Sequence, residues 1–304
     1  MAVVWWPRVK LKTASHKLEH LQRLACLLIT GALRTTPTKA LEIIVDLLPL
    51  PIYIMQTAML ACLRLRASHQ WVYAHCGHPR IYTFLEQYAP LTLLRGDKII
   101  PSYTFDSNYV ICIPTKDDWL SQTIRIPDDI VCYTDGSRLQ RLGRTGASVF
   151  NQTTNVKLTL PLGKYSTVFQ AEIYAILACA SSLYNECEVS IAICSDSQAA
   201  LKVIQSAKTR SSLVAETKSA LGKLSTFNSV RLLWVPGHNN VPGNETADEL
   251  AKQAAAMEFI GPEPVVGISS NTAQNKISSW ATSEHCLLWQ SSGLQTSKDV
   301  PSRP

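Results

Sequence analysis

The sequence predicts an α/β domain, a mixed five-stranded sheet with flanking helices, preceded by a small all-helical basic module. Two observations support this fold class. From residue 128 onward, β-rich runs alternate with amphipathic helical stretches, and three strand candidates precede the first helix. Upstream of residue 86, apolar residues recur at helical spacing and basic residues outnumber acidic ones. Three strands followed by helix and strand in alternation is typical of a mixed sheet covered by helices.

Composition places the chain among globular proteins and excludes several classes. With 304 residues, 46% hydrophobic and 17% charged, it suits two domains with a buried core. The nine Cys form no Cys-x-x-Cys pair, and we find no secretion signal, so we expect an intracellular protein in cytoplasm or nucleus. The apolar stretch 41–63 is broken by acidic residues and Pro, so we expect no membrane span. We also expect no small-molecule cofactor.

The helical basic module is expected at residues 1–85, with helices at 10–30, 39–48 and 51–66. In the first of these helices the apolar residues at helical spacing are Leu18, Leu21, Leu24, Ala25 and Leu28. It carries 10 Lys and Arg against 3 acidic residues, whereas residues 128–258 carry 12 of each sign. The basic surplus has two open interpretations, a solvated face or a platform for nucleic acid.

Two stretches give weak periodicity. Residues 86–127 contain four Pro and are expected to form an irregular linker with short strands. Residues 259–304 are expected to be a poorly structured C-terminal tail, in which Trp280 and Trp289 could anchor a short helix.

The segment 128–258 supplies the elements of the predicted sheet. The first strand begins at Ile130 and ends with Asp135 before a Gly turn. The other strand candidates are residues 146–151, 156–160, 190–194 and 230–235. The helix candidates are residues 169–183, 197–206, 212–225 and 244–257.

Four carboxylates are placed where this topology can bring them together. Asp135 and Asp196 follow strands, Glu172 lies early in the first helix of the segment, and Asp248 lies in the first turns of its last helix. Each alone fits a turn, a helix cap or a solvated surface. Together at one sheet edge they would repel one another unless cations bind. Oxygen ligands suit Mg²⁺ or Mn²⁺, and two such ions about 4 Å apart clamp the attacking and leaving oxygens of a phosphodiester.

The loop between the last strand and the last helix contains two Gly and two Pro and carries His238. Its sequence runs Val235-Pro236-Gly237-His238 and continues to Gly243. An imidazole beside a two-metal site fits a proton shuttle to the leaving 3′ oxygen.

These blocks resemble the type-1 ribonuclease H family. The matching blocks are Asp135-Gly136-Ser137, Gln170-Ala171-Glu172, Ser195-Asp196-Ser197-Gln198, Val235-Pro236-Gly237-His238 and Gly243-Asn244-Glu245-Thr246-Ala247-Asp248. The resemblance implies a ribonuclease H-like fold and cleavage of the RNA strand of RNA–DNA hybrids, which leaves 3′-hydroxyl and 5′-phosphate ends. It also implies that Asp135, Glu172, Asp196 and Asp248 bind two Mg²⁺ ions and that His238 assists product release.

The same resemblance implies substrate contacts and one departure. Ser137, Ser197, Gln198 and Asn244 match positions that family members use near the hybrid backbone and minor groove. The long basic handle of several cellular members is missing or reduced between Ser206 and Ser212. Affinity for the hybrid would then depend on the basic module, because phosphate neutralisation dominates affinity.

Upstream blocks resemble the segment between polymerase and ribonuclease H in insect-type non-LTR retrotransposon polyproteins. They are Val4-Trp5-Trp6-Pro7, residues 21–25 and residues 31–37. The chain carries no polymerase signature such as Ala-Asp-Asp, so we expect a fragment without the reverse transcriptase core. The alternative is a catalytically silent nucleic-acid-binding remnant, although no acid is lost. An integrase-like or junction nuclease is disfavoured by the Gly-His loop.

Overall fold

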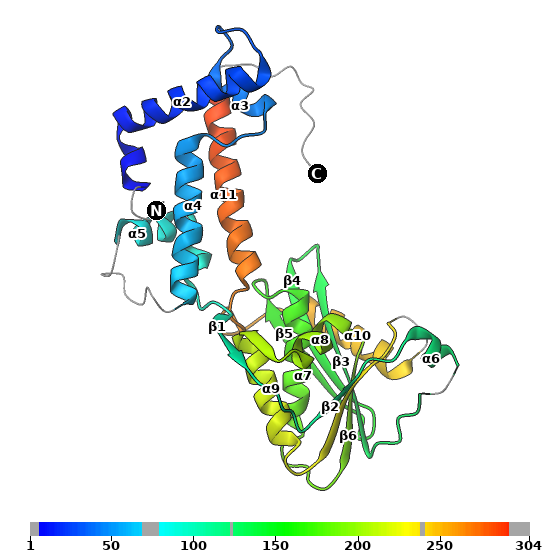
Figure 1. Ribbon diagram of the computed structural model, residues 1–304. Coiled ribbons are helices and arrows are strands. Elements are labelled where there is room, and N and C mark those ends of the chain that lie inside the picture. Colours follow the sequence, from blue (N-terminus) through cyan, green and yellow to red (C-terminus); the bar gives the residue numbers. More distant parts are fainter. Residues whose placement is uncertain (1–5, 69–78, 122–123, 238–240, 292–304) are drawn as a thin grey trace. The chain divides into compact units, whose positions relative to one another are not determined.

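The computed structural model describes residues 6–68, 79–121, 124–237 and 241–291 (Figure 1). It divides into two compact units, one made of residues 1–93 and 271–304 and the other of residues 94–270. In the described ranges, every helix is too short or too polar to cross a bilayer.

The second unit is built on a six-stranded mixed sheet with strand order β2-β8-β6-β3-β4-β5. β3 pairs antiparallel with β4 and parallel with β6, which confirms the α/β fold class with a mixed sheet. The predicted number of five strands was too low, because β2, from the stretch that was expected to be a linker, pairs parallel with β8. The strands are β2 (Val110–Cys112), β3 (Ile130–Leu139), β4 (Arg144–Asn151), β5 (Val156–Gly163), β6 (Ser190–Ser195) and β8 (Ser229–Trp234).

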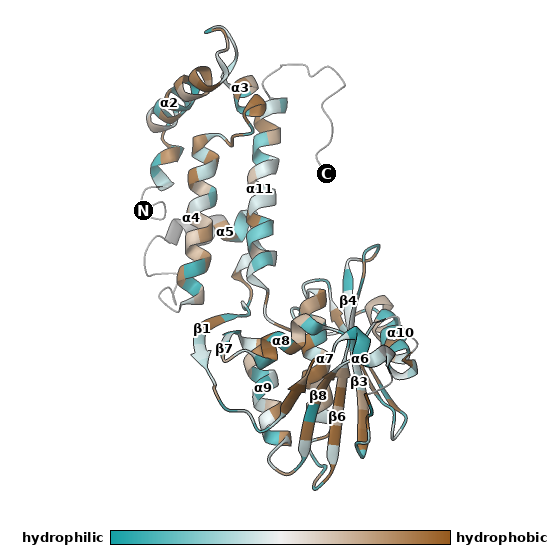
Figure 2. Cartoon of the chain, turned by 45° about the vertical axis from the view of Figure 1, so that its right-hand side comes forward, coloured by the Kyte–Doolittle hydropathy of each residue, from teal (hydrophilic) through white to brown (hydrophobic). Residues whose placement is uncertain are grey.

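Helices cover both faces of this sheet because alternate strand residues point to opposite sides. Cys132 and Ile193 pack in the main core against helices on one face, and Tyr133 and Cys194 pack on the other face against the last helix of the unit. Figure 2 shows the matching apolar colour along β6 and β8. The first face carries α7 (Val168–Ser182), α8 (Gln198–Gln205) and α9 (Ser212–Leu224), and the second carries α10 (Pro242–Ala256).

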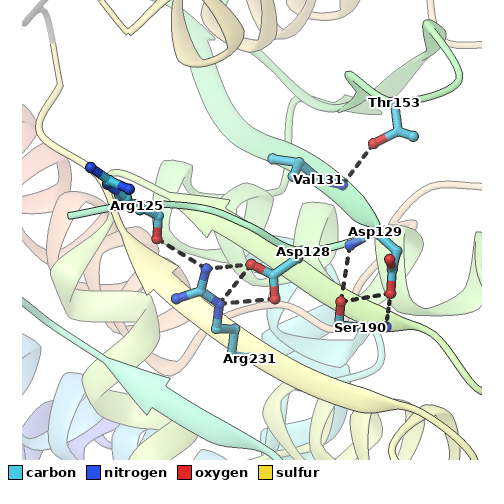
Figure 3. Close-up of polar contacts among 7 residues, drawn as sticks. All are labelled: Arg125, Asp128, Asp129, Val131, Thr153, Ser190 and Arg231. Carbon is cyan, nitrogen blue, oxygen red and sulfur yellow. Dashed lines mark hydrogen bonds and ion pairs between the residues drawn. The ribbon is translucent and has the colours of Figure 1, made fainter.

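A polar cluster fixes the beginning of β3 relative to its neighbours (Figure 3). Arg231 on β8 donates from Nε to both carboxylate oxygens of Asp128, at 3.0 and 2.9 Å, and from Nη2 to the Arg125 carbonyl at 3.3 Å. Asp129 accepts from the backbone and hydroxyl of Ser190 at the start of β6, at 2.8 and 2.7 Å. The strands therefore start in a set register, and their opposite ends are aligned where the acids lie.

The stretch 86–127 is more ordered than the expected linker. It contributes β1 (Lys98–Tyr103), β2 and the short helix α6 (Lys116–Leu120), and it joins the sheet-containing unit from Leu94 onward. β1 pairs antiparallel with β7 (Lys208–Ser211), which lies in the short segment between Ser206 and Ser212. These strands are short and their partners lie far along the chain, so local periodicity could not predict them.

The helical unit also contains a C-terminal helix, which corrects the expected poorly structured tail. Helix α11 runs over Ser270–Gln290, and the last dozen residues lie outside the described ranges. Ile277, Trp280 and Ala281 of α11 share a core with Met59 and Cys62. The N-terminal elements are η1 (Trp6–Lys10), α2 (Lys12–Thr30), α3 (Thr38–Ile44), α4 (Leu50–Ala67), α5 (Pro79–Tyr88) and η2 (Pro90–Leu93).

Helix α2 forms as expected, but Leu21, Leu24 and Leu28 are exposed. Leu21 and Leu28 are 59% and 86% exposed. The buried side chains of α2 are Gln22 and Cys26, and Gln22 donates to the Leu48 carbonyl at 2.9 Å and accepts from the Leu50 amide at 2.6 Å. The Leu48 carbonyl and the Leu50 amide, which border the start of α4, therefore help to set which face of α2 points inward.

Some basic side chains of the helical unit have structural roles. Arg23 donates to the Thr36 carbonyl at 2.7 Å, and Arg66 donates to the Thr92 carbonyl at 2.5 Å. Part of the positive surplus is thus used to hold loops, and the nucleic-acid platform stays a prediction.

A glycine pair tests the close packing of α10, the helix that carries Asp248. A Cβ on Gly146 of β4 would overlap the backbone nitrogen of Ala255, whereas a Cβ on Gly222 of α9 meets nothing within 4 Å. We expect Gly146→Ala to lower the free energy of unfolding by about 1–3 kcal/mol. Gly222→Ala should raise it by about 0.5–1 kcal/mol, because Ala favours a helix more than Gly does. Urea unfolding of the full chain measures both, and equal effects would contradict the close contact.

Candidate active site

Asp135 lies where the parallel partner of its strand ends. Pairing of β3 with β6 stops at Thr134 and Ser195, whereas pairing of β3 with β4 continues to Leu139. The expected Gly turn after Asp135 is therefore wrong, since Gly136 lies inside the strand. A Cβ there would come within 2.5 Å of the Glu172 backbone nitrogen. Gly136 is needed because α7 passes directly over it, and this close approach sets Glu172 beside Asp135.

The start of α7 is fixed by its own cap. Thr167 accepts from the Gln170 amide at 3.2 Å, and the Gln170 side chain accepts from the Thr167 amide at 3.1 Å. The Gln170 side chain also donates to the Gly267 carbonyl at 2.7 Å. This reciprocal cap sets where the helix begins and hence the position of Glu172 two residues later.

Three of the four predicted acids meet. One carboxylate oxygen from each of Asp135, Glu172 and Asp196 lies within 4.8 Å of the other two. Asp135 and Glu172 are buried, with 5% and 7% of their surface exposed. In the described part of the chain, Asp135 Oδ2 and Glu172 Oε2 have no hydrogen-bond partner. Buried carboxylate oxygens without partners are costly, so this group is suited to hold a cation.

The electrostatics of the group follow from burial and mutual repulsion. Burial, with the nearby charges of Asp196 and Asp248, raises the pKa of Asp135 to about 7. Burial first, and then Asp135 and Asp196, raises the pKa of Glu172. Both acids thus hold protons more tightly than exposed ones do when no cation is present.

Asp248 lies outside the three-acid group but close enough to act on it. Its charge contributes to the raised pKa values of Asp135 and Glu172. Its Oδ2 accepts from Lys252 Nζ at 2.6 Å, one turn along α10. Sequence reasoning missed Lys252, although the i,i+4 spacing after Asp248 could have indicated the ion pair.

Residues of β8 and α10 contact Asp196. Trp234 donates from its indole to the Asp196 carbonyl at 3.0 Å, and the Asn244 amide lies 3.5 Å from Asp196 Oδ2. Gly237 passes so close that a Cβ there would lie 2.9 Å from the same oxygen. Asn244, predicted to contact substrate, is buried and its Oδ1 is without a partner among the described residues.

Ser137, Ser197 and Gln198 lie on the same strand or at the start of the helix that follows one of the acids. Ser197 caps α8 by accepting from the Ala200 amide at 3.3 Å, and half-buried Gln198 begins that helix. Ser137 is half-buried and shares a strand face with Asp135. His238 lies outside the described residues.

The raised pKa of Asp135 predicts how stability depends on pH. The group binds its proton up to about pH 7 in the folded chain but titrates near 3.8 ordinarily, so metal-free stability should fall as pH rises from about 4 to 7. Asp135→Asn removes that loss and should be more stable than the parent at pH 8 in EDTA. Urea unfolding at pH 5 and pH 8 measures the effect, with exposed Asp106→Asn as control. A variant less stable than the parent at pH 8 would contradict the repulsion.

Comparison with known proteins agrees with this geometry. Residues 127–256 match the RNase H family. A ribonuclease H from Pectobacterium carotovorum subsp. carotovorum (strain PC1) is 33% identical over 136 residues, which cover 40% of this chain and 87% of that protein. The matched segment contains β3 through α10 and all four acids. The chain therefore belongs to the ribonuclease H family, through the segment that carries the acidic group.

Proposed function

We propose that this chain is an endoribonuclease that cuts the RNA strand of RNA–DNA hybrids with Mg²⁺ as its metal. Its family membership supports the reaction class. The observation that carries the proposal is the pair of buried carboxylate oxygens, on Asp135 and Glu172, that lack hydrogen-bond partners beside Asp196. A fold that only bound nucleic acid would have no reason to keep them together.

The donor set fits a hard divalent cation. All candidate ligand atoms are carboxylate oxygens, which favour Mg²⁺ or Mn²⁺ over softer metals. We assign Asp135, Glu172, Asp196 and Asp248 to hold two such ions. When bound, the ions supply an activated water and stabilise charge on the phosphodiester oxygens.

Other residues of the chain would place the hybrid and move protons. His238, in the loop that follows β8, is proposed to give a proton to the leaving 3′ oxygen. Ser137, Ser197, Gln198 and Asn244 are proposed to contact the backbone and minor groove, where 2′-hydroxyls distinguish RNA from DNA. For Asn244, the contact with Asp196 favours a second role in orienting that acid.

We also propose that the chain derives from a retroelement. The support is the upstream sequence similarity to retrotransposon polyproteins at residues 4–7, 21–25 and 31–37. The basic helical module at residues 1–85 is proposed to help hold the hybrid, because residues 128–258 carry equal numbers of basic and acidic groups.

Cleavage of a labelled hybrid tests the reaction. We expect Mg²⁺-dependent cutting of the RNA strand and none of duplex DNA or duplex RNA. Glu172→Gln should abolish cutting, because it removes a charge from the three-acid group. Glu245→Gln is the matched control, since Glu245 is an exposed acid in the first turn of α10 and should cut as the parent does. Hybrid binding without any cutting by the parent chain would favour a silent binding remnant.

His238→Ala should behave differently from the loss of an acid. The acids would still assemble, so cutting should fall by roughly 10- to 1,000-fold without vanishing, and hybrid affinity should stay nearly unchanged. Single-turnover rates and hybrid dissociation constants measure the two quantities. A variant as inactive as Glu172→Gln would mean that His238 supports the acidic group and transfers no proton.

A further inference from the structure

The β1–β7 ribbon presents one face made of aromatic and basic side chains. Tyr103 lies directly opposite Lys208 in the antiparallel pair, so the two share a face. Thr209 is 2% exposed and points the other way, which places Lys208 and Arg210 together on the outer face. Phe105 follows two residues after Tyr103. These four residues, Tyr103, Phe105, Lys208 and Arg210, are called the aromatic-basic ribbon below.

The two rings are exposed and aligned. Tyr103 is 57% and Phe105 is 81% exposed, and their centroids lie 6.3 Å apart with an angle of 14° between the ring planes. Lys208 Nζ lies 5.5 Å from the centre of the Tyr103 ring. Singly exposed aromatic side chains are common, but a near-parallel exposed pair beside a cation is a surface on which a flat group can stack.

The charge around the rings is positive. Arg95, just before β1, and Lys98, its first residue, are also exposed. Of the two acids on the same stretch, Asp97 is buried and accepts from the Leu213 amide at 3.0 Å and the Ser212 hydroxyl at 2.9 Å. Only Asp106 among the acids of residues 94–106 is exposed. The ribbon thus offers several cations to a polyanion.

The ribbon is tied to the same unit as the acids. Asp97 fixes it to the beginning of α9, and the Thr104 amide donates to the Ala207 carbonyl at 2.9 Å. Helix α8 begins just after Asp196 and ends just before β7. Its eight residues span about 12 Å, so one bound nucleic acid can reach both places.

We propose that the aromatic-basic ribbon binds unpaired nucleotides of a single strand that flanks the hybrid. Exposed rings bind bases whose faces are free, whereas the bases inside a duplex are already stacked on one another. Lys208 and Arg210 neutralise the phosphates on either side of the stacked bases. This site goes beyond the proposed cleavage, because it needs neither metal nor hydrolysis.

Binding of single strands by the full chain in EDTA tests this site separately from cleavage. Fluorescence anisotropy with labelled oligothymidylate and oligouridylate gives the dissociation constants, and a blunt hybrid is measured alongside. Tyr103→Ala with Phe105→Ala should weaken single-strand binding at least about tenfold, and weaken hybrid binding less. The matched control is Tyr184→Ala with Phe227→Ala, two aromatics that are 66% and 69% exposed in the same unit, which should bind as the parent does.

Salt dependence tests the cations of the ribbon. Lys208→Gln with Arg210→Gln should reduce the slope of log affinity against log salt for single strands by about 1.4, at about 0.7 per phosphate contact. Unchanged single-strand binding in the aromatic double variant would overturn the proposal, as would equal losses for single strand and blunt hybrid. Circular dichroism of each variant shows whether the fold is retained, and the salt slope of the charge variant applies even if the aromatic variant unfolds.

Discussion

The candidate site depends on the cost of gathering carboxylates out of water. Asp135 and Glu172 are almost fully buried beside Asp196, and each has an oxygen that no described group satisfies. Burial and mutual repulsion both favour the protonated forms, so the folded chain pays for this arrangement unless a cation binds. The register of the sheet, the cap of α7 and the lack of a side chain at Gly136 all serve to keep these acids within reach of one another.

Much of the sheet-containing fold and of the acidic group was predictable, because residues 128–258 have strong hydrophobic periodicity. The predicted strands and helices of residues 128–258 are all present, since each buries an apolar face, but β3 continues to Leu139 and the short strand β7 was not predicted. The meeting of Asp135 and Asp196 followed from their positions at the ends of neighbouring strands. Gly136 was misjudged as a turn, because a dipeptide does not reveal that a helix will cross the strand. The ion pair of Asp248 with Lys252 was not predicted, although their i,i+4 spacing in α10 is compatible with it.

Strand β1, helix α11 and the inward face of α2 could not be predicted from local sequence, because each depends on contacts with distant parts of the chain. β1 exists only because β7, more than a hundred residues later, supplies its partner. Helix α11 has a polar sequence overall, and it is held by Ile277 and Trp280, which share a core with residues of α4. In α2, leucine spacing indicated the wrong inward face, because Cys26 and the hydrogen-bonded Gln22 are the buried side chains. The segment before the matched family region contributes the sheet strand β2 and the two aromatic residues of the aromatic-basic ribbon, whereas Lys208 and Arg210 come from β7 inside that region.

Binding of Mn²⁺ to the full chain, followed by the electron paramagnetic resonance of the free ion, tests the central claim most directly. It reports on the acidic group without any substrate. We predict saturable binding that weakens at least about tenfold in Glu172→Gln and in Asp135→Asn, and that stays unchanged in Glu245→Gln. Absence of saturable binding by the parent chain, or equal binding by Glu172→Gln, would contradict the account of these carboxylates as a metal site.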